Sequence, residues 1–283
     1  MFDCRVSTSV VHRLPKPRRR VRLPYPACFL LQSRKKGNSG CAGASGDYPL
    51  CSIIAWRLSS FMKQRKRIDY SGLNLGTVTK PEYAHVLLMG GWVFYLAFFY
   101  ITERVIKPER FHEIHCALDD IIPFNEYFLI FYVSWYLLVG GAVIFYLLYD
   151  RQIFKHLQIF LIVTQIIGII TYIVYPSIQN LRPETFPRDN ILTRATAYLY
   201  SIDTNTGVFP SMHVAFAVAV LSAAIRDKYL TGLQKWLIAV WVILISVSVC
   251  FVKQHSALDV ISALLVCALA ELMARKLVRD DGE

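Results

Sequence analysis

The sequence predicts an all-α integral membrane protein, built as a bundle of six transmembrane helices. Hydrophobic residues make up 55% of the 283 residues, charged residues make up only 18%, and the mean hydropathy is +0.40. A soluble domain of this length is normally less apolar and more highly charged. The apolar residues are also gathered into long runs, which is the pattern of helices that cross a membrane.

Six apolar runs define the predicted spans. They cover residues 83–101, 127–149, 157–175, 213–225, 236–252 and 256–272. A helix needs about 20 apolar residues to cross about 30 Å of hydrocarbon. The run at 213–225 is the shortest, so we expect it to span only if residues from 208–210 or 224–229 extend it.

The region before the first run differs in composition from the rest of the chain. Residues 1–62 contain 11 Lys and Arg but only two acidic residues, with scattered Pro, Gly and Ser and no helical or strand period. We interpret this leader as disordered or as preceding the true start, for which Met62 is a candidate. An organelle transit peptide and a small folded element are the alternatives.

The charges on the loops predict the orientation in the membrane. With residues 63–82 on the cytoplasmic side, that side receives 13 basic residues and the opposite side receives 7. The positive-inside rule then places both termini, including a tail at 276–283, in the cytoplasm. The leader carries +9 of the net charge of +11, so the membrane domain at 83–275 gives no indication of nucleic-acid binding.

The sequence does not predict a metal site at its cysteines or at the pair His112 and His115. Four of the seven cysteines lie in the leader, and the spacing of Cys116, Cys250 and Cys267 fits neither a metal site nor a disulfide framework. His112 and His115 lie near several carboxylates. We interpret residues 103–118 as an amphipathic segment on the membrane surface, with Val105, Phe111, Ile114 and Leu118 on its apolar face.

Two short segments place a histidine where an apolar run begins. The first is Pro210-Ser211-Met212-His213, and the second is Lys253-Gln254-His255 followed by Asp259. On a helix, His255 and Asp259 would share one face, so the carboxylate could orient the imidazole. A histidine oriented in this way and facing a second histidine is typical of a nucleophile with its acid partner. Alone, His213 would more simply be a helix-end residue facing water.

Several groups near these histidines are suited to bind an anion. Arg182 lies on the loop after the third run, on the same predicted face, and its guanidinium matches phosphate oxygens. A helix that begins near Ser211 would present free N–H groups to the same anion, although Ser211 is also a natural N-cap. Lys253 is either a phosphate ligand or an interfacial anchor.

The chain resembles the type 2 phosphatidic acid phosphatase superfamily, which has three sequence motifs. The corresponding segments here are, in order, Arg182-Pro183, the Pro210 segment and the His255 segment. The resemblance covers residues 83–275. It implies a membrane-embedded lipid phosphate phosphatase or phosphotransferase. The loop charges place both histidine segments on the extracytoplasmic or lumenal side, and no metal-ligand cluster accompanies them, so we expect a reaction without a metal or cofactor. A site at the membrane surface would let the head group of a membrane lipid enter while its chains stay in the bilayer.

By the resemblance, the catalytic residues are His255 as the nucleophile that forms a phosphohistidine, Asp259 as its orienting group and His213 as the acid, and Arg182 clamps the phosphate. Ser211 and Lys253 are further candidates for phosphate binding.

The chain departs from the family pattern at three positions. Tyr175 and Val249 stand where the family usually has a lysine and an arginine, so two expected cations are missing. Lys253, Arg188 and Arg194 are the candidates to replace them. Met212, in place of the usual glycine, is similar to the branch that contains inositol phosphorylceramide synthases. Transfer to an alcohol therefore stays open beside hydrolysis, as does a non-catalytic anion transporter on the same six spans.

Overall fold

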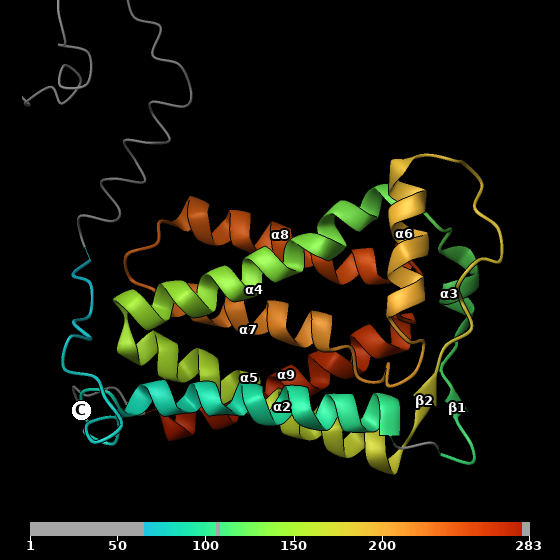
Figure 1. The fold of residues 1–283 in the computed structure, drawn as a ribbon. Coiled ribbons are helices and arrows are strands. Elements are labelled where there is room, and N and C mark those ends of the chain that lie inside the picture. The colour runs from blue at the N-terminus through green and yellow to red at the C-terminus, as the bar shows by residue number, and fades with distance from the viewer. Residues whose placement is uncertain (1–64, 106–107, 279–283) are drawn as a thin grey trace, which may run out of the picture. The chain divides into compact units, whose positions relative to one another are not determined.

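The fold is a bundle of long apolar helices, with α3, α6 and the two short strands gathered at one end (Figure 1). The computed structural model describes residues 65–105 and 108–278, so the predictions for the leader lie outside the described residues. The helices of the bundle are α2 (Gly90–Tyr100), α4 (Leu129–Tyr149), α5 (Arg151–Val174), α7 (Met212–Arg226), α8 (Gly232–Phe251) and α9 (Ala257–Leu277). The short elements are η1 (Ala84–Met89), η2 (Ile101–Val105), β1 (His112–Glu113), α3 (Ala117–Ile121), η3 (Glu126–Phe128), β2 (Ser177–Ile178) and α6 (Ile191–Ile202).

Within the described residues, five helical segments are long and apolar enough to cross a membrane. They are Ala84–Val105, Glu126–Tyr149, Arg151–Val174, Gly232–Phe251 and Ala257–Leu277. These segments coincide with five of the six predicted spans, and the prediction of a helical membrane protein is confirmed at that level. The sixth predicted span is α7, which has only 15 residues.

Helix α7 lies inside the bundle, in contact with α4, α5, α8 and α9. Its small residues, among them Ala215, Ala219 and Ala223, are completely buried and let the neighbouring backbones approach closely. At about 1.5 Å per residue, its 15 residues rise about 22 Å, less than the hydrocarbon thickness of about 30 Å. Met212 and Val214, in the first turn of α7, are buried within the bundle.

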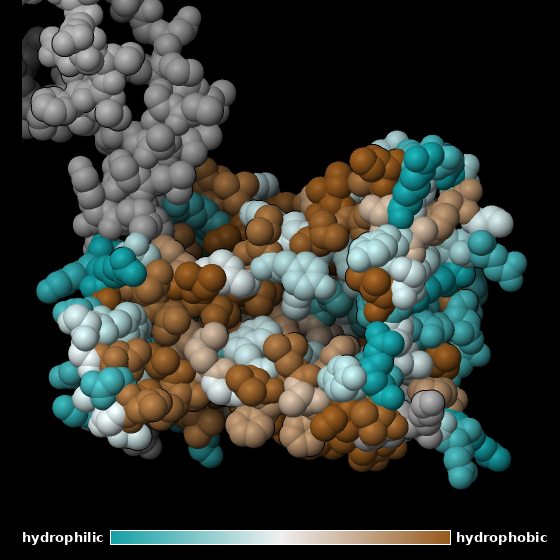
Figure 2. Space-filling model, viewed as in Figure 1, coloured by the Kyte–Doolittle hydropathy of each residue, from teal (hydrophilic) through white to brown (hydrophobic). Residues whose placement is uncertain are grey.

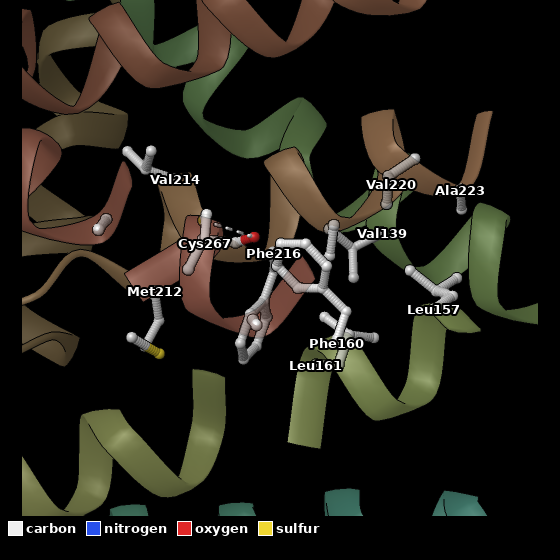
Figure 3. Close-up of a cluster of buried hydrophobic side chains, with 14 of the residues drawn as sticks. Val139, Leu157, Phe160, Leu161, Met212, Val214, Phe216, Val220, Ala223 and Cys267 are labelled. Atoms are coloured by element: carbon white, nitrogen blue, oxygen red, sulfur yellow. Dashed lines mark hydrogen bonds between the residues drawn. The ribbon is translucent and has the colours of Figure 1, made fainter. Parts of the chain in front are cut away.

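The core surrounds this central helix. Figure 3 shows Phe216 and Val220 of α7 beside Phe160 and Leu161 of α5 and Val139 of α4, all of them buried. Burying a large apolar side chain contributes about 1.5–3 kcal/mol in water, whereas in a bilayer close van der Waals packing has to supply the stability. The interlocking of large and small side chains around α7 provides this packing.

The outward faces of the bundle are apolar. Phe94, Leu137 and Leu265 are 68%, 73% and 71% exposed. Figure 2 shows apolar side chains over the flanks of the helices and polar side chains gathered at the end that carries α3, α6 and the two strands. An extended apolar surface of this kind needs lipid as its solvent.

Two regions at the polar end differ from the expectations. Residues 103–118 do not form one amphipathic segment, because β1 pairs in parallel with β2 and Ile114 is buried. The region after Arg182 contains α6, where only a loop is expected from the sequence. The Asn190 side chain caps this helix by accepting from the backbone N–H groups of Leu192 and Thr193, at 2.9 and 3.0 Å.

Candidate active site

The structure brings the four motif residues, Arg182, His213, His255 and Asp259, close together through direct contacts or through neighbouring residues. The rings of His213 and His255 lie 5.7 Å apart in an edge-to-face arrangement. The backbone N–H of Ser211 donates to the carbonyl of Asp259 at 3.1 Å, which joins the starts of α7 and α9. Arg182 donates to the side chain of Gln254, which precedes His255, at 2.6 Å.

His255 lies just before α9, not on it. The helix begins at Ala257, with Ser256 as its N-cap, so the expectation that His255 and Asp259 share a helix face is wrong. Asp259 instead occupies the third position of a capping box, and its Oδ2 accepts from the backbone N–H of Ser256 at 2.9 Å. The same oxygen lies 3.2 Å from His255 Nδ1. One carboxylate therefore caps the helix and orients the histidine.

The surroundings of His255 determine where its ring proton lies. Nδ1 is within 3.1 Å of the Val208 carbonyl oxygen and 3.2 Å of Asp259 Oδ2, and both of these atoms only accept hydrogen bonds. Nδ1 must therefore carry the proton, which leaves the lone pair of the neutral ring on Nε2. Nε2 is the atom of His255 that is suited to attack an electrophile.

His213 is held by aromatic packing. It is the second residue of α7, and its ring lies 4.6 Å from the ring of Tyr132 and 4.8 Å from that of Trp135. Among the residues that the structure describes, none is seen to hydrogen-bond the His213 ring. Its nitrogens are thus available to exchange a proton with a ligand.

Helix α3 braces the start of α9 through Asp119. One of its carboxylate oxygens accepts from Ser256 Oγ at 2.5 Å, and the other accepts from the backbone N–H of Ala257 at 2.8 Å. Burial raises the pKa of Asp119, but these bonds and those from Cys116 outweigh burial and lower it below its usual value. Asp119 therefore stays charged at neutral pH and fixes the backbone next to His255.

Lys253 holds the other end of α3. Its Nζ donates to the carbonyl oxygens of Asp119 and Ile122 at 2.8 and 2.5 Å, and the residue is 8% exposed. Its backbone has φ +54°, in the left-handed region, at the tight turn between α8 and α9. In this conformation Lys253 caps the carboxyl end of α3 and does not face His255.

Arg182 anchors the segment that follows α6. Its Nη1 donates to the carbonyls of Tyr200 and Asp203 at 3.3 and 3.1 Å, and its Nη2 donates to the Thr204 carbonyl at 2.7 Å and to Gln254 Oε1. The guanidinium also lies over the ring of Tyr200. The terminal nitrogens that the sequence assigns to phosphate thus hold this segment against the residue before His255.

The remaining candidates for phosphate binding differ in their surroundings. Ser211 is the N-cap of α7, yet its buried Oγ has no partner among the described residues. Arg188 donates to Glu126 at 2.6 and 2.8 Å, and Arg194 donates to Asp189 at 2.8 and 2.9 Å. The two arginines are therefore ion-paired and do not replace the missing family cations.

The positions of the missing cations have structural roles. Tyr175 ends α5 and stacks on His112, with ring centroids 4.0 Å apart. Val249 is fully buried, and its carbonyl accepts from the backbone N–H groups of Gln254 and His255 at 2.9 and 3.1 Å. Val249 thereby shapes the turn that carries His255.

The two histidines open into a cavity of about 360 Å³. Its walls come from α2, α4, α6, the end of α5, the segment from 203 to 208 and the beginnings of α7 and α9. The lining residues are Tyr95, Leu96, Phe99, Trp135, Tyr136, Tyr172, Leu199, Ile202, Asp203, Thr204, Thr206, Gly207, Val208, Met212, His213, Gln254 and His255. The cavity thus combines aromatic and aliphatic side chains with a smaller set of polar residues, among them Asp203, Gln254 and the two histidines.

The segment from 203 to 208 contains functional residues that the sequence motifs do not reveal. The carboxylate of Asp203 lines the cavity and accepts from Gln254 Nε2 at 3.3 Å. Burial raises the pKa of Asp203, against the lowering effect of the nearby Arg182 and His255. The only signal in the sequence is an acidic residue shortly before the Pro210 motif.

Two small residues fix this segment. Ser177 Oγ accepts from the backbone N–H groups of Val208 and Phe209, each at 3.1 Å, which places the Val208 carbonyl on His255. Gly207 has φ +61°, and a Cβ there would lie 2.5 Å from Glu103 Oε1. A glycine is therefore required where the chain turns past η2.

Metal ligands are not gathered in the described part of the chain. No group of three or more His, Cys, Asp or Glu residues within it has the arrangement needed to hold a metal ion. His115 bonds Asp120 at 2.8 Å, and His112 stacks on Tyr175. The described residues thus offer a nucleophile, a second histidine and an orienting carboxylate.

The comparison with known protein families matches this part of the chain. The model of the PAP2 superfamily matches residues 156–283, a range that contains Arg182, His213, His255 and Asp259. No curated protein and no solved structure matches the chain in the same comparison. The resemblance predicted from the motifs is therefore confirmed over residues 156–283, the range that matches the PAP2 superfamily.

Proposed function

We propose that this protein cleaves the phosphate ester of a membrane lipid through a phosphohistidine on His255. The observation that carries the proposal is the geometry of this residue. Its Nδ1 faces the Val208 carbonyl and Asp259 Oδ2, and its ring faces His213 across a cavity. A histidine that is needed only for packing would not require two acceptors on Nδ1 and a free Nε2.

The proposed reaction has two steps. His255 Nε2 attacks phosphorus, the bond from phosphorus to the alcohol oxygen of the lipid breaks, and His213 gives a proton to that oxygen. Water then attacks the phosphohistidine, His213 takes the proton of the water, and the N–P bond breaks. The positive charge that forms on His255 in the first step is balanced by Asp259.

Hydrogen-bond donors near His255 would stabilise the negative charge on the phosphoryl oxygens. Ser211 Oγ is buried without a partner among the described residues, and the first turn of α7 directs backbone N–H groups toward the cavity end. Arg182 would contact phosphate by exchanging Gln254 Oε1 for a phosphoryl oxygen. Lys253 supports the site by holding α3.

The position of the cavity supports a lipid substrate. Leu96 of α2, Tyr136 of α4 and Ile202 of α6 line it and are 59%, 61% and 52% exposed on the flank of the bundle. A head group can therefore approach the histidines while its chains stay beside the helices. In this proposal α7 completes six spans, its first turn recessed beneath the membrane surface.

Hydrolysis and transfer share the first step and differ in the acceptor. If an alcohol replaces water, the same site acts as a phosphotransferase, as in the inositol phosphorylceramide synthases that Met212 resembles. In the structure Met212 lines the cavity, and its side chain lies against Gly168 of α5. A non-catalytic anion transporter would need neither the His255–Asp259 contact nor the pairing of His213 with His255.

The proposal predicts a trapped intermediate. Purified protein mixed with a lipid labelled at phosphorus, in the presence of EDTA, should carry acid-labile and alkali-stable label when quenched within one turnover. The label should be absent from His255→Ala and should be released by water or an added alcohol. The measurement is protein-bound radioactivity together with the products of the chase.

Different results would contradict this prediction. If His255→Ala were labelled as strongly as the native protein, the nucleophile would be another residue. If no lipid were cleaved and vanadate, which mimics the pentacoordinate transition state, bound no better than to His255→Ala, the anion-transport alternative would replace the enzyme. Loss of turnover in EDTA would contradict the metal-independent mechanism.

The proposed orientation predicts which residues a membrane-impermeant thiol reagent labels in intact cells. Asp189→Cys, at the end that carries the active site, should be labelled from outside. Lys228→Cys, at the opposite end, should be labelled only after the membrane is opened, since 13 of the basic residues after position 62 lie on that side. Both side chains are exposed. The reverse pattern would place the active site in the cytoplasm.

A further inference from the structure

A carboxylate at the end of the first span lies behind the wall of the active-site cavity. Glu103 belongs to η2, a single turn of π-helix, and it bonds two threonines that line the cavity, although it is not itself a lining residue. It and Arg104 are the only acidic or basic residues of the span Ala84–Val105, and Arg104 donates to the Ile202 carbonyl at 3.3 Å. A carboxylate in an apolar span is costly and is generally there for a function, and π-helical turns are frequent at functional sites.

Glu103 contacts the segment from 203 to 208 at three residues. Its Oε2 accepts hydrogen bonds from Thr204 Oγ1 and, at 3.2 Å, from Thr206 Oγ1. Its Oε1 lies so close to Gly207 that a Cβ on this residue would be 2.5 Å away. The end of the first span therefore holds this segment along much of its length.

A second set of contacts joins the same segment to β2 and to the residue after it. The backbone N–H of Gly207 donates to the Ser177 carbonyl at 2.9 Å. Asn205 Nδ2 donates to the Gln179 carbonyl at 2.8 Å, and the backbone N–H of Gln179 donates to the Asn205 carbonyl at 3.0 Å. None of these bonds uses a threonine hydroxyl. The hydroxyls of the segment are thus left to bond Glu103 and each other.

The segment ends at the residue that contacts the proposed nucleophile. The carbonyl oxygen of Val208 lies 3.1 Å from His255 Nδ1 and is one of the two acceptors on that nitrogen. Val208 directly follows the residues that Glu103 holds, so a shift of Thr206 or Gly207 would move this carbonyl. Misplacing a group by about 1 Å can lower a catalytic rate by about 10²-fold.

We propose that Glu103 is a positioning residue of the active site, which keeps the Val208 carbonyl on His255 Nδ1. It does so by giving the hydroxyls of Thr204 and Thr206 a hydrogen-bond acceptor at a fixed place. Because Glu103 does not line the cavity, it acts through the segment and not on the substrate. The inference rests on the proposed function, since it assigns a supporting residue to the same nucleophile.

The first test removes the acceptor and keeps a side chain of similar size. Glu103→Leu should lower kcat by about 10- to 100-fold and leave KM within about threefold. The melting temperature should stay the same or rise, because leucine suits an apolar span better than a carboxylate does. Glu103→Gln keeps an oxygen that can accept from both threonines, so its kcat should lie within about threefold of the native value. Full-length protein in mixed micelles is assayed with phosphatidic acid and with p-nitrophenyl phosphate.

The two probes show whether the effect passes through His255. His213→Ala should recover on p-nitrophenyl phosphate, whose leaving group needs no acid. Glu103→Leu should lose the same factor on both probes, because it disturbs the nucleophile and not the acid. The rate at which label from phosphatidic acid appears on His255 within one turnover should fall by that factor too. Recovery of Glu103→Leu on the activated ester would overturn the assignment.

A second variant removes the other half of the same contact. Thr204→Val combined with Thr206→Val deletes both hydroxyls with little change of shape and should lower kcat by a factor similar to that of Glu103→Leu. Adding Glu103→Leu to it should lower kcat little further, since residues that share one contact are not additive. The matched control is Glu113→Gln, an exposed carboxylate that accepts from Asn180 and does not line the cavity, and it should behave like the native protein.

The outcomes separate this inference from the proposed function. If Glu103→Leu keeps the native kcat, or if kcat and melting temperature fall together and Glu103→Gln restores neither, the inference fails while a labelled His255 still supports the enzyme. Additive effects of Glu103→Leu and the double threonine variant would also overturn it, as would a rise in KM alone. If the native protein cleaves neither probe and carries no label on His255, the proposed function fails and the inference fails with it.

Discussion

His255→Ala is expected to lose turnover on every substrate, whereas His213→Ala is expected to recover turnover on substrates with good leaving groups. Without His255, no atom in the described cavity takes the place of its Nε2 as nucleophile. Without His213, the nucleophile remains but the departing alkoxide has no acid, and general acid catalysis contributes roughly 10²- to 10⁴-fold. An activated ester, such as a p-nitrophenyl phosphodiester, needs no such acid.

The measurement is the ratio of kcat/KM on an alkyl ester to that on the corresponding p-nitrophenyl ester for each variant. His115→Ala is the matched control, since this histidine lies at the surface, bonds Asp120 and does not line the cavity. It should behave like the native protein. If both cavity variants recovered equally on the activated ester, the roles assigned to His213 and His255 would be wrong.

Asp259→Asn is expected to lower kcat by about 10²- to 10⁴-fold with little loss of stability. The carboxylate keeps the proton of His255 on Nδ1 and balances the charge that the ring gains during attack, and removing such a partner from a catalytic histidine has costs of this size. Asparagine can still accept from the Ser256 N–H through its amide oxygen, which takes the place of the carboxylate oxygen in the capping box.

The comparison with Asp119→Asn separates chemistry from folding. Asp119 holds Ser256 and Ala257 but does not contact His255, so this variant should lower the melting temperature while changing kcat only a few fold. The loss of its charge-assisted hydrogen bonds is worth about 1.5–3 kcal/mol. Equal loss of kcat in both variants, with equal loss of stability, would mean that Asp259 acts only as a cap.

The predicted spans agree with the helices to within a few residues wherever a continuous apolar run marks the helix. The run at 127–149 became α4, and the run at 256–272 became α9, because hydropathy over about 20 residues already requires a buried or lipid-facing helix. The third span began earlier than expected, since Asp150 caps α5 by accepting from the Ile153 N–H at 3.0 Å. Helix α6 was missed because its amphipathic 12 residues carry no membrane signal.

For the candidate site, too, the sequence predicts some features and misses others. The sequence identifies His213, His255 and Asp259 because the chemistry needs those residue types in a fixed order. It assigns the wrong geometry to His255 and Asp259, since a spacing of four fits a helix face as well as a pair in which the histidine precedes the N-cap and the aspartate closes the capping box. Nothing in the order of residues shows that the Nη atoms of Arg182 are occupied by the carbonyls of a distant segment.

By itself, the sequence determined that the chain forms apolar membrane helices and carries the histidine motifs of the PAP2 superfamily, because hydropathy and motif spacing are properties of neighbouring residues. Only the tertiary structure decided which partners surround these motifs. The Val208 carbonyl on His255, the Asp203 carboxylate in the cavity and the occupied guanidinium of Arg182 all depend on contacts between segments that lie far apart in the chain. Such contacts arise when helices pack around α7, and packing is a property of the whole bundle.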